Sequence, residues 1–129
     1  MTKWLLIFIA LTTLVAGCSA PIKVQEQVRA DFAGNQSCID LFLNDDAGGT
    51  YQTFAQDIDK AAFAVGRYLS GEVAVCAWGG AKPWQSWGDA ETVVIEQCER
   101  VRLSHMSQHE REVAPCEIYA RNNEILPGR

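Results

Sequence analysis

The amino-acid sequence predicts an α+β fold: a small three-stranded, largely antiparallel sheet with one capped amphipathic helix packed on it, in the order α-β-β-α-β and stapled by disulfides. Three observations predict this fold. Two alternating apolar segments flank Ser70-Gly71, apolar residues recur at helical spacing between positions 86 and 102, and a third alternating segment begins at Cys116. A chain of this length suffices for one domain and not for two, so we expect a single domain over residues 35–129.

The chain begins with a segment typical of an export signal. Residues 1–17 combine one cation, Lys3, with an apolar run shorter than the roughly 20 residues of a membrane span. The run ends in Val15-Ala16-Gly17-Cys18, which closely resembles the lipobox of bacterial lipoproteins. The resemblance implies that residues 1–17 are removed and that acyl chains on Cys18 hold the protein on a membrane. The alternative is an ordinary secretory signal with an incidental cysteine.

The residues that follow the lipobox predict a location and a tether. By resemblance to Gram-negative sorting, a residue other than Asp after the lipidated cysteine, here Ser19, favours the outer membrane. We therefore expect an anchor in the outer membrane facing the periplasm, or facing outward where the host has one membrane. Residues 18–34 are mostly polar and lack a strong core pattern, which predicts a lipidated N-terminus and tether.

Four cysteines remain beyond Cys18, and their number indicates disulfides. In an exported chain an even number implies two bridges, and four cysteines allow three pairings. We favour Cys98–Cys116, which joins the helix to the strand that returns across it, together with Cys38–Cys76. A closed loop as long as the first contributes on the order of 3 kcal/mol in the chain-entropy model. No C-x-x-C occurs, so neither a thioredoxin-type site nor a zinc ribbon is indicated.

The charge balance argues against nucleic acid as a partner. The chain carries 11 Lys and Arg against 16 Asp and Glu, a net charge of -5, and removal of Lys3 with the signal makes it more negative. No basic cluster is present to neutralise phosphates. An acidic surface favours solubility and weakly repels anionic lipid headgroups, which fits a domain held off the membrane.

Residues before the hairpin predict one short helix and one undecided element. Residues 36–44 are apolar enough to bury one element, either a helix or a strand, before the break at residues 45–49. Residues 50–58 place apolar side chains at helical spacing, with Thr50 as a candidate N-cap. The predicted hairpin of residues 60–69 and 72–78 follows, and because its second strand is apolar on both faces, we expect that strand to be central.

The second half of the chain predicts a loop, the capped helix and the last strand. Two glycines and a proline predict that residues 79–86 form a loop. Ser86 and Asp89 have the spacing of a capping box. One helix face is then lined by Ala90, Val94, Cys98 and Val101. Polar residues 103–115 predict an exposed loop or a frayed extension of the helix, and Asn122-Asn123 forms a turn after the third strand.

This pattern resembles a disulfide-containing module of small exported proteobacterial proteins. The resemblance covers residues 58–126 and is carried by Lys60-Ala-Ala-Phe-Ala-Val, by Ala90 through Cys98-Glu99, and by Pro115-Cys116-Glu-Ile-Tyr-Ala. The module consists of a hairpin, a helix ending near a cysteine and a strand beginning at another. The resemblance implies the fold and the Cys98–Cys116 bridge, but no activity.

The candidates for catalysis or metal binding are few. His105 and His109 are four residues apart, as in helical zinc sites, but Met106 stands where the Glu of H-E-x-x-H would be, and a solvated loop is the alternative. The chain has no G-x-S-x-G, and both disulfides would leave no free thiol. We therefore expect no metal, no cofactor and no catalytic residues.

The tryptophans are the strongest candidate for binding. Trp78, Trp84 and Trp87 lie within ten residues and surround Lys82, and aromatic side chains on a rigid loop suit sugars or a partner protein. The alternative is structural: Trp78 belongs to the hairpin core, while Trp84 and Trp87 staple the start of the helix.

These observations favour a non-enzymatic envelope lipoprotein that binds an envelope protein or peptidoglycan. One alternative is an inhibitor of a cell-wall hydrolase, because W-Q-S-W-G-D-A-E-T-V before Cys98 resembles a segment of small membrane-bound lysozyme inhibitors. Those inhibitors are all-β proteins, and the capped helix argues against this alternative. A small hydrolase that uses His105 or His109 is the second alternative.

Overall fold

The computed structural model describes residues 22–43 and 50–127, which form an α+β domain with an antiparallel sheet. The sheet has four strands in the order β2-β1-β3-β4, not the predicted three, and three helices precede the hairpin instead of one. The missed fourth strand has only two residues, too few for an alternating pattern. The elements are α1 (Ile22–Asp31), α2 (Gln36–Leu43), α3 (Tyr51–Asp57), β1 (Lys60–Arg67), β2 (Val73–Ala81), α4 (Trp87–His109), β3 (Glu117–Arg121) and β4 (Glu124–Ile125).

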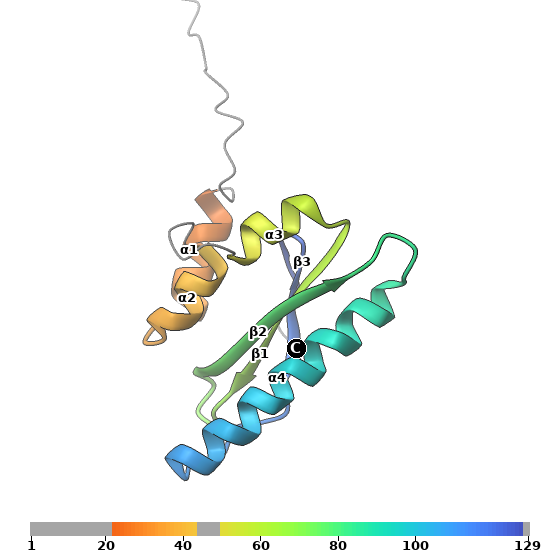
Figure 1. The fold of residues 1–129 in the computed structure, drawn as a ribbon. Helices are drawn as coiled ribbons and strands as arrows, with labels where there is room; N and C mark the ends of the chain where they lie inside the picture. Colours follow the sequence, from red (N-terminus) through yellow and green to blue (C-terminus); the bar gives the residue numbers. More distant parts are fainter. Residues whose placement is uncertain (1–21, 44–49, 128–129) are drawn as a thin grey trace, which may run out of the picture.

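Helices cover both faces of the sheet. Helices α1 to α3 gather on one side and α4 runs along the other (Figure 1). The α1–α3 side holds an aromatic core whose neighbouring ring centroids lie 4.8 to 6.3 Å apart. The side under α4 is built from alanines and valines, which lets the helix lie close to the strands. The aromatic core consists of Phe32, Phe42, Tyr51, Phe63 and Tyr119.

The segment predicted to be a tether is largely helical and contributes two buried side chains to this core. Residues from Ile22 to Asp31 form α1, and the side chains of Val28 and Phe32 are fully buried. Phe32 stacks on Phe63 with centroids 5.8 Å apart. The prediction of a tether is therefore wrong for residues 22–34, because two apolar side chains one helical turn apart suffice to dock a short helix whose remaining residues are polar.

The prediction that the second hairpin strand is central is also wrong. Strand β1 lies between β2 and β3, and β2 forms an edge of the sheet. Both faces of β2 are apolar because α4 covers one and α2 and α3 cover the other, as the bridge from Cys76 to Cys38 and the contact of Trp78 with Phe54 show. Apolar side chains on both faces of a strand indicate that other layers cover both faces, but they do not indicate a neighbouring strand on each side.

Residues 79–81, predicted to start the loop, continue β2. Gly79 and Gly80 pair with Ala62 and Ala61. A Cβ at Gly79 would lie 3.3 Å from Val94 Cγ2 in α4, and one at Gly80 would lie 2.6 Å from the Lys60 carbonyl oxygen and 3.0 Å from the Phe54 ring. The glycines therefore allow close approach of neighbouring layers and do not end the strand.

Helix α4 confirms the predicted cap and extends further than the predicted range. The Ser86 hydroxyl accepts from the Asp89 amide at 3.2 Å, and the Asp89 carboxylate accepts from the Ser86 amide at 2.9 Å. The helix runs to His109, so of the two alternatives for residues 103–115 the helical extension holds as far as His109. Ala90, Val94 and Cys98 are buried, but Val101 is 39% exposed, which corrects its assignment to the buried stripe.

Both predicted disulfides are present. Cys38–Cys76 ties α2 to β2, and Cys98–Cys116 ties α4 to the residue before β3. The undecided element at residues 36–44 is thus helix α2, and the short helix predicted after Thr50 is α3, although the Thr50 side chain makes no capping bond.

The predicted signal peptide, the lipobox and Cys18 lie outside the described residues. Within residues 22–43 and 50–127, no helix combines the length and the apolar character needed to cross a membrane.

Candidate functional site

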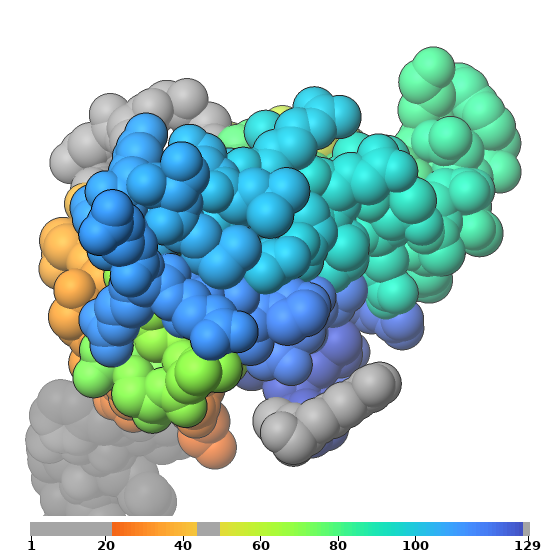
Figure 2. Space-filling model, turned by 90° about the horizontal axis from the view of Figure 1, so that it is seen from below, coloured from red at the N-terminus to blue at the C-terminus, as the bar shows by residue number. Residues whose placement is uncertain are grey.

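The connection between β2 and α4, residues 82–86, projects from one end of the domain, and we call it the tryptophan loop (Figures 1 and 2). Two hydrogen bonds of 2.9 Å close it, because the Gln85 amide donates to the Lys82 carbonyl and the Lys82 amide donates to Gln85 Oε1. The capping box of Ser86 fixes its other end. The loop is therefore a short, internally bonded connection between a strand and a capped helix.

The structure separates the three tryptophans that the sequence places together. Trp78 is half-buried and packs on Phe54, with ring centroids 4.6 Å apart. Trp87 begins α4, and the Arg121 guanidinium lies 5.2 Å from its ring centroid. Trp84 is 77% exposed at the loop tip and does not staple the helix. The structural interpretation thus fits Trp78, whereas Trp84 is the most exposed of these three tryptophans.

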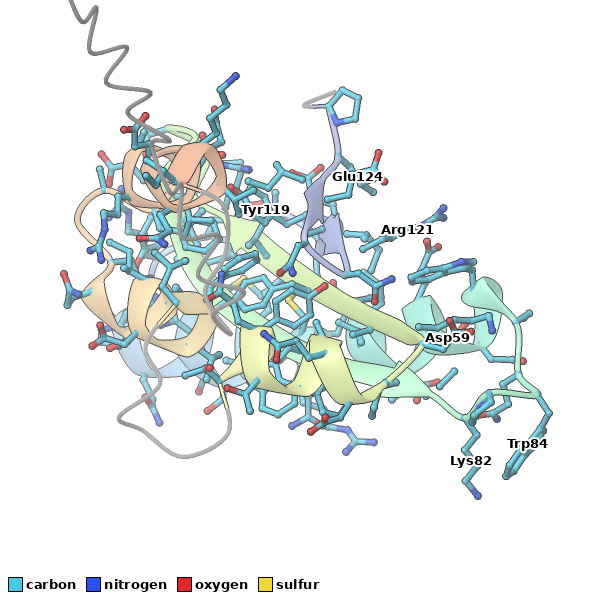
Figure 3. The ribbon with its side chains drawn as sticks, turned by 90° about the horizontal axis from the view of Figure 1, so that it is seen from above. Asp59, Lys82, Trp84, Tyr119, Arg121 and Glu124 are labelled. Atoms are coloured by element: carbon cyan, nitrogen blue, oxygen red, sulfur yellow. A yellow bond between two sulfur atoms is a disulfide. The ribbon has the colours of Figure 1, made fainter. Side chains whose placement is uncertain are left out.

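Lys82 and Trp84 form one exposed unit on the loop. The Lys82 ammonium lies 5.3 Å from the centroid of the Trp84 ring, and both side chains point away from the body of the domain (Figure 3). Lys60 reaches the base of the loop, where it donates to the Pro83 carbonyl at 3.4 Å and to Asp59 at 3.0 Å. A cation over an indole face is a weak contact in water and strengthens when a partner excludes the water.

A groove of about 1180 Å³ runs along β3 and β4, and the sequence did not predict it. Four of its charged side chains form two ion pairs: Arg67 donates to Glu117 at 3.1 Å, and Arg121 donates to Glu91. The Tyr119 hydroxyl donates to Asp31 at 2.5 Å. Burial and then the Asp31 carboxylate raise the pKa of Tyr119, so it stays a neutral donor. The groove therefore presents satisfied polar groups.

His105 and His109 do come together, on the last turns of α4. Their ring centroids lie 4.3 Å apart, and His105 Nε2 is 2.7 Å from the Tyr68 hydroxyl. Partial burial lowers the pKa of His105, and the charges of His109 and Arg111 lower it further. Among residues 22–43 and 50–127, no three His, Cys, Asp or Glu side chains are grouped as a metal ion would require. His105 thus acts in the structure as a hydrogen-bond partner of the hairpin turn.

In comparisons with protein families, curated proteins and solved structures, the chain matched none.

Proposed function

We propose that this chain is a lipid-anchored envelope protein whose domain binds a partner, a protein or peptidoglycan, through the tryptophan loop without catalysing a reaction. The observation that supports this function is Trp84, which is 77% exposed on a loop closed by its own hydrogen bonds. A large aromatic side chain held in water gains most when a partner covers it, and a preformed loop loses little conformational entropy on binding.

Lys82 adds a charge to this contact surface. The ammonium beside the indole lets the loop tip recognise an acidic or hydroxyl-rich surface while the ring covers an apolar one. The chain as a whole is acidic, with a net charge of -5, so the loop carries a local charge opposite to the average of the chain. We therefore expect long-range repulsion to turn an acidic partner away from the rest of the surface and leave the loop as the favoured contact.

The anchor is supported by the lipobox sequence Val15-Ala16-Gly17-Cys18. Acyl chains on Cys18 would hold the protein on the membrane with about 0.8 kcal/mol per buried CH₂ group. Replacing Cys18 by Ser should abolish labelling by a fatty-acid analogue and release the protein from washed membranes. An unlabelled wild-type chain, or a Ser variant that keeps its label, would contradict the anchor.

The binding role is tested by crosslinking in intact cells. The wild-type chain should capture a specific envelope component, and Trp84→Ala with Lys82→Ala should reduce the yield at least about tenfold, the loss expected when a contact of roughly 1.4 kcal/mol disappears. The matched control is Leu69→Ala, because Leu69 is 74% exposed but lies in the β1–β2 turn. Equal capture by all three proteins would exclude the loop as the contact.

Inhibition of a cell-wall hydrolase is a second candidate, favoured by the projecting position of Lys82 and Trp84 (Figure 3). Glycosidase clefts carry paired carboxylates beside a sugar site, and a cation next to an aromatic ring is complementary to such a cleft. The test adds the purified full chain to lysozyme and follows cell-wall lysis. Lysis at an unchanged rate would remove this candidate, and inhibition lost in Trp84→Ala would support it.

A further inference from the structure

Strand β2 leaves one row of backbone groups facing away from the sheet. Ala61 donates its amide to Asn122 Oδ1, and its carbonyl accepts from the Asn122 amide, so its backbone groups point toward β3. Its partner across the β1–β2 ladder is Gly80, whose groups must then point outward. Because backbone groups alternate in direction along a strand, the amides and carbonyls of Trp78 and Cys76 also point outward. Among the described residues, no strand pairs with this side.

The open edge of β2 lacks the usual protection against pairing. Natural edge strands carry charges or proline, or are very short, whereas β2 has nine residues with neither a charge nor a proline. Among residues 22–43 and 50–127, side-chain hydrogen bonds cover one end of this edge, where the Asn35 amide donates to the carbonyls of Val73 and Ala74 at 3.1 and 3.3 Å. The opposite edge of the sheet is protected, because β4 is two residues long and Arg67 and Glu117 form an ion pair beside β3.

Apolar side chains flank this edge in both neighbouring layers. On α4, Val93 and Val101 are 52% and 39% exposed and lie two helical turns apart. A Cβ at Gly79 would lie 3.9 Å from Val93 Cγ1, which places Val93 beside β2. Leu41 of α2 and Val101 of α4 both line a groove of about 560 Å³ along the first half of β2. The edge face thus carries apolar side chains from both layers, while Asn35, Glu72 and His105 add polar groups to the groove.

We propose that a second copy of this chain covers this face, with the two β2 strands paired antiparallel about a two-fold axis near Trp78. Nine strand residues span about 30 Å, and a sheet between two helix layers about 10 Å away on each side gives an edge face of roughly 600 to 750 Å² per copy. Standard interfaces bury roughly 600 to 1,000 Å² per partner, so the face lies at the lower end of this range. The strands carry no charges that would repel each other.

A second copy fits this face better than a single peptide strand. A lone strand would pair with the backbone of β2 but, being about 5 Å wide, would leave the side of α4 largely uncovered. A second copy places its own α4 beside α4 and its own layer of helices α1 to α3 beside the same layer of the first copy. The outward-pointing backbone groups of the two copies also lie opposite each other. When Trp78 of one copy pairs with Trp78 of the other, Cys76 of each copy pairs with Gly80 of its partner.

The dimer would fix the distance between the two tryptophan loops, which matters for the proposed binding role. The dimer itself does not depend on that role. Lys82 lies four residues beyond Trp78, so the two tryptophan loops would emerge at opposite ends of the paired strands, about 25 Å apart. Two contacts at a fixed distance raise the avidity for a repetitive surface without any new contact.

Native mass spectrometry of the full chain released from detergent micelles tests the proposal. The wild-type chain should give twice the monomer mass in a concentration-dependent manner. Val93→Lys with Val101→Lys should raise the dissociation constant at least about 100-fold, because two aliphatic contacts are lost and like charges face each other. The control is Leu103→Lys, at a residue 57% exposed on the same helix but turned away from the sheet, and it should remain dimeric.

Amide hydrogen exchange identifies the surface independently of any variant. The amides of Trp78 and Gly80 should be protected in the concentrated wild-type chain and should exchange faster on dilution. A monomer at every concentration would overturn the proposal. So would a dimer in which these two amides exchange as fast as in the diluted protein, or one that Leu103→Lys disrupts as strongly as the double variant.

Discussion

Replacement of Gly80 by Ala is expected to destabilise the domain although Gly80 lies in a strand, where Ala is ordinarily preferred. The added Cβ would lie 2.6 Å from the Lys60 carbonyl oxygen and 3.0 Å from the Phe54 ring, so β1 and β2 must separate by several tenths of an ångström. Overpacking of this kind costs about 1 to 3 kcal/mol. The unfolded chain has less conformational entropy with Ala than with Gly, which offsets about 0.4 to 1 kcal/mol of this cost. The net loss is therefore about 1 to 2 kcal/mol, or roughly 5 to 15 °C in Tm for a domain of this size.

The assay is urea unfolding of the full chain with its disulfides intact, followed by circular dichroism. The matched control is Gly88→Ala near the start of α4, where the new Cβ would meet Ser86 Oγ at 3.5 Å, an ordinary contact. This control should be neutral or stabilising by up to about 1 kcal/mol, because Ala is the better helix former. A Gly80→Ala protein as stable as the wild type would refute the close approach of the strands at this position.

Three further results are expected. Replacing Cys98 and Cys116 by Ala should cost about 3 kcal/mol of unfolding free energy, the chain-entropy value for a bridge with a separation of 18 residues, and a loss under 1 kcal/mol would contradict it. Ser86→Ala should cost about 1 kcal/mol by removing the helix cap, measured by the same unfolding. Because the fold lowers the pKa of His105 below the value of the unfolded chain, stability should be complete at neutral pH and should decrease as the pH falls through about 6.5. Replacing His105 by Gln should flatten this dependence, while Tyr68→Phe should leave part of it, since burial is the leading cause of the shift.

Local chemistry predicted the features of the fold that depend on near neighbours. The capping box at Ser86 and Asp89, the helical spacing after it and the turn at Asn122 each follow from a few adjacent residues, and the structure shows all of them. The pairing of Cys98 with Cys116 followed from a helix that must meet a returning strand. These features need no knowledge of the strand order.

Features that depend on distant neighbours were missed. Residues 79–80 carry no local signal that Val94 and Phe54 lie close to the two glycines. The sequence therefore predicted that the glycine pair ends the strand, whereas β2 continues through it. Likewise α1 is polar except for a few residues, and only the cavity between Phe42, Phe63 and Tyr119 explains why Phe32 docks there. The one signal in the sequence for this docking is Phe32, a lone aromatic residue in the predicted tether.

For the candidate site, the sequence identified the segment that holds the three tryptophans, but not that Trp84 is the exposed one among them. Three tryptophans within ten residues suggest one cluster, but Trp78 lies inside a strand and faces α3, whereas Trp84 lies in the loop. Their separation follows from the extension of β2 to Ala81, which was not foreseen because of the glycines. The groove beside β3 could not be predicted, since Arg121, Glu91 and Asp31 come from three separate elements.

The position of β2 at the edge links the mistaken prediction to the proposed dimer. A strand that is apolar on both faces is normally found inside a sheet because neighbours there protect its backbone. Here the helices supply the apolar faces, the disulfide from Cys76 to Cys38 holds the strand against α2, and the backbone of the edge still faces outward. A strand fixed in this way cannot protect its edge by fraying, so the outward-facing amides and carbonyls of β2 stay available for the proposed antiparallel pairing with a second copy.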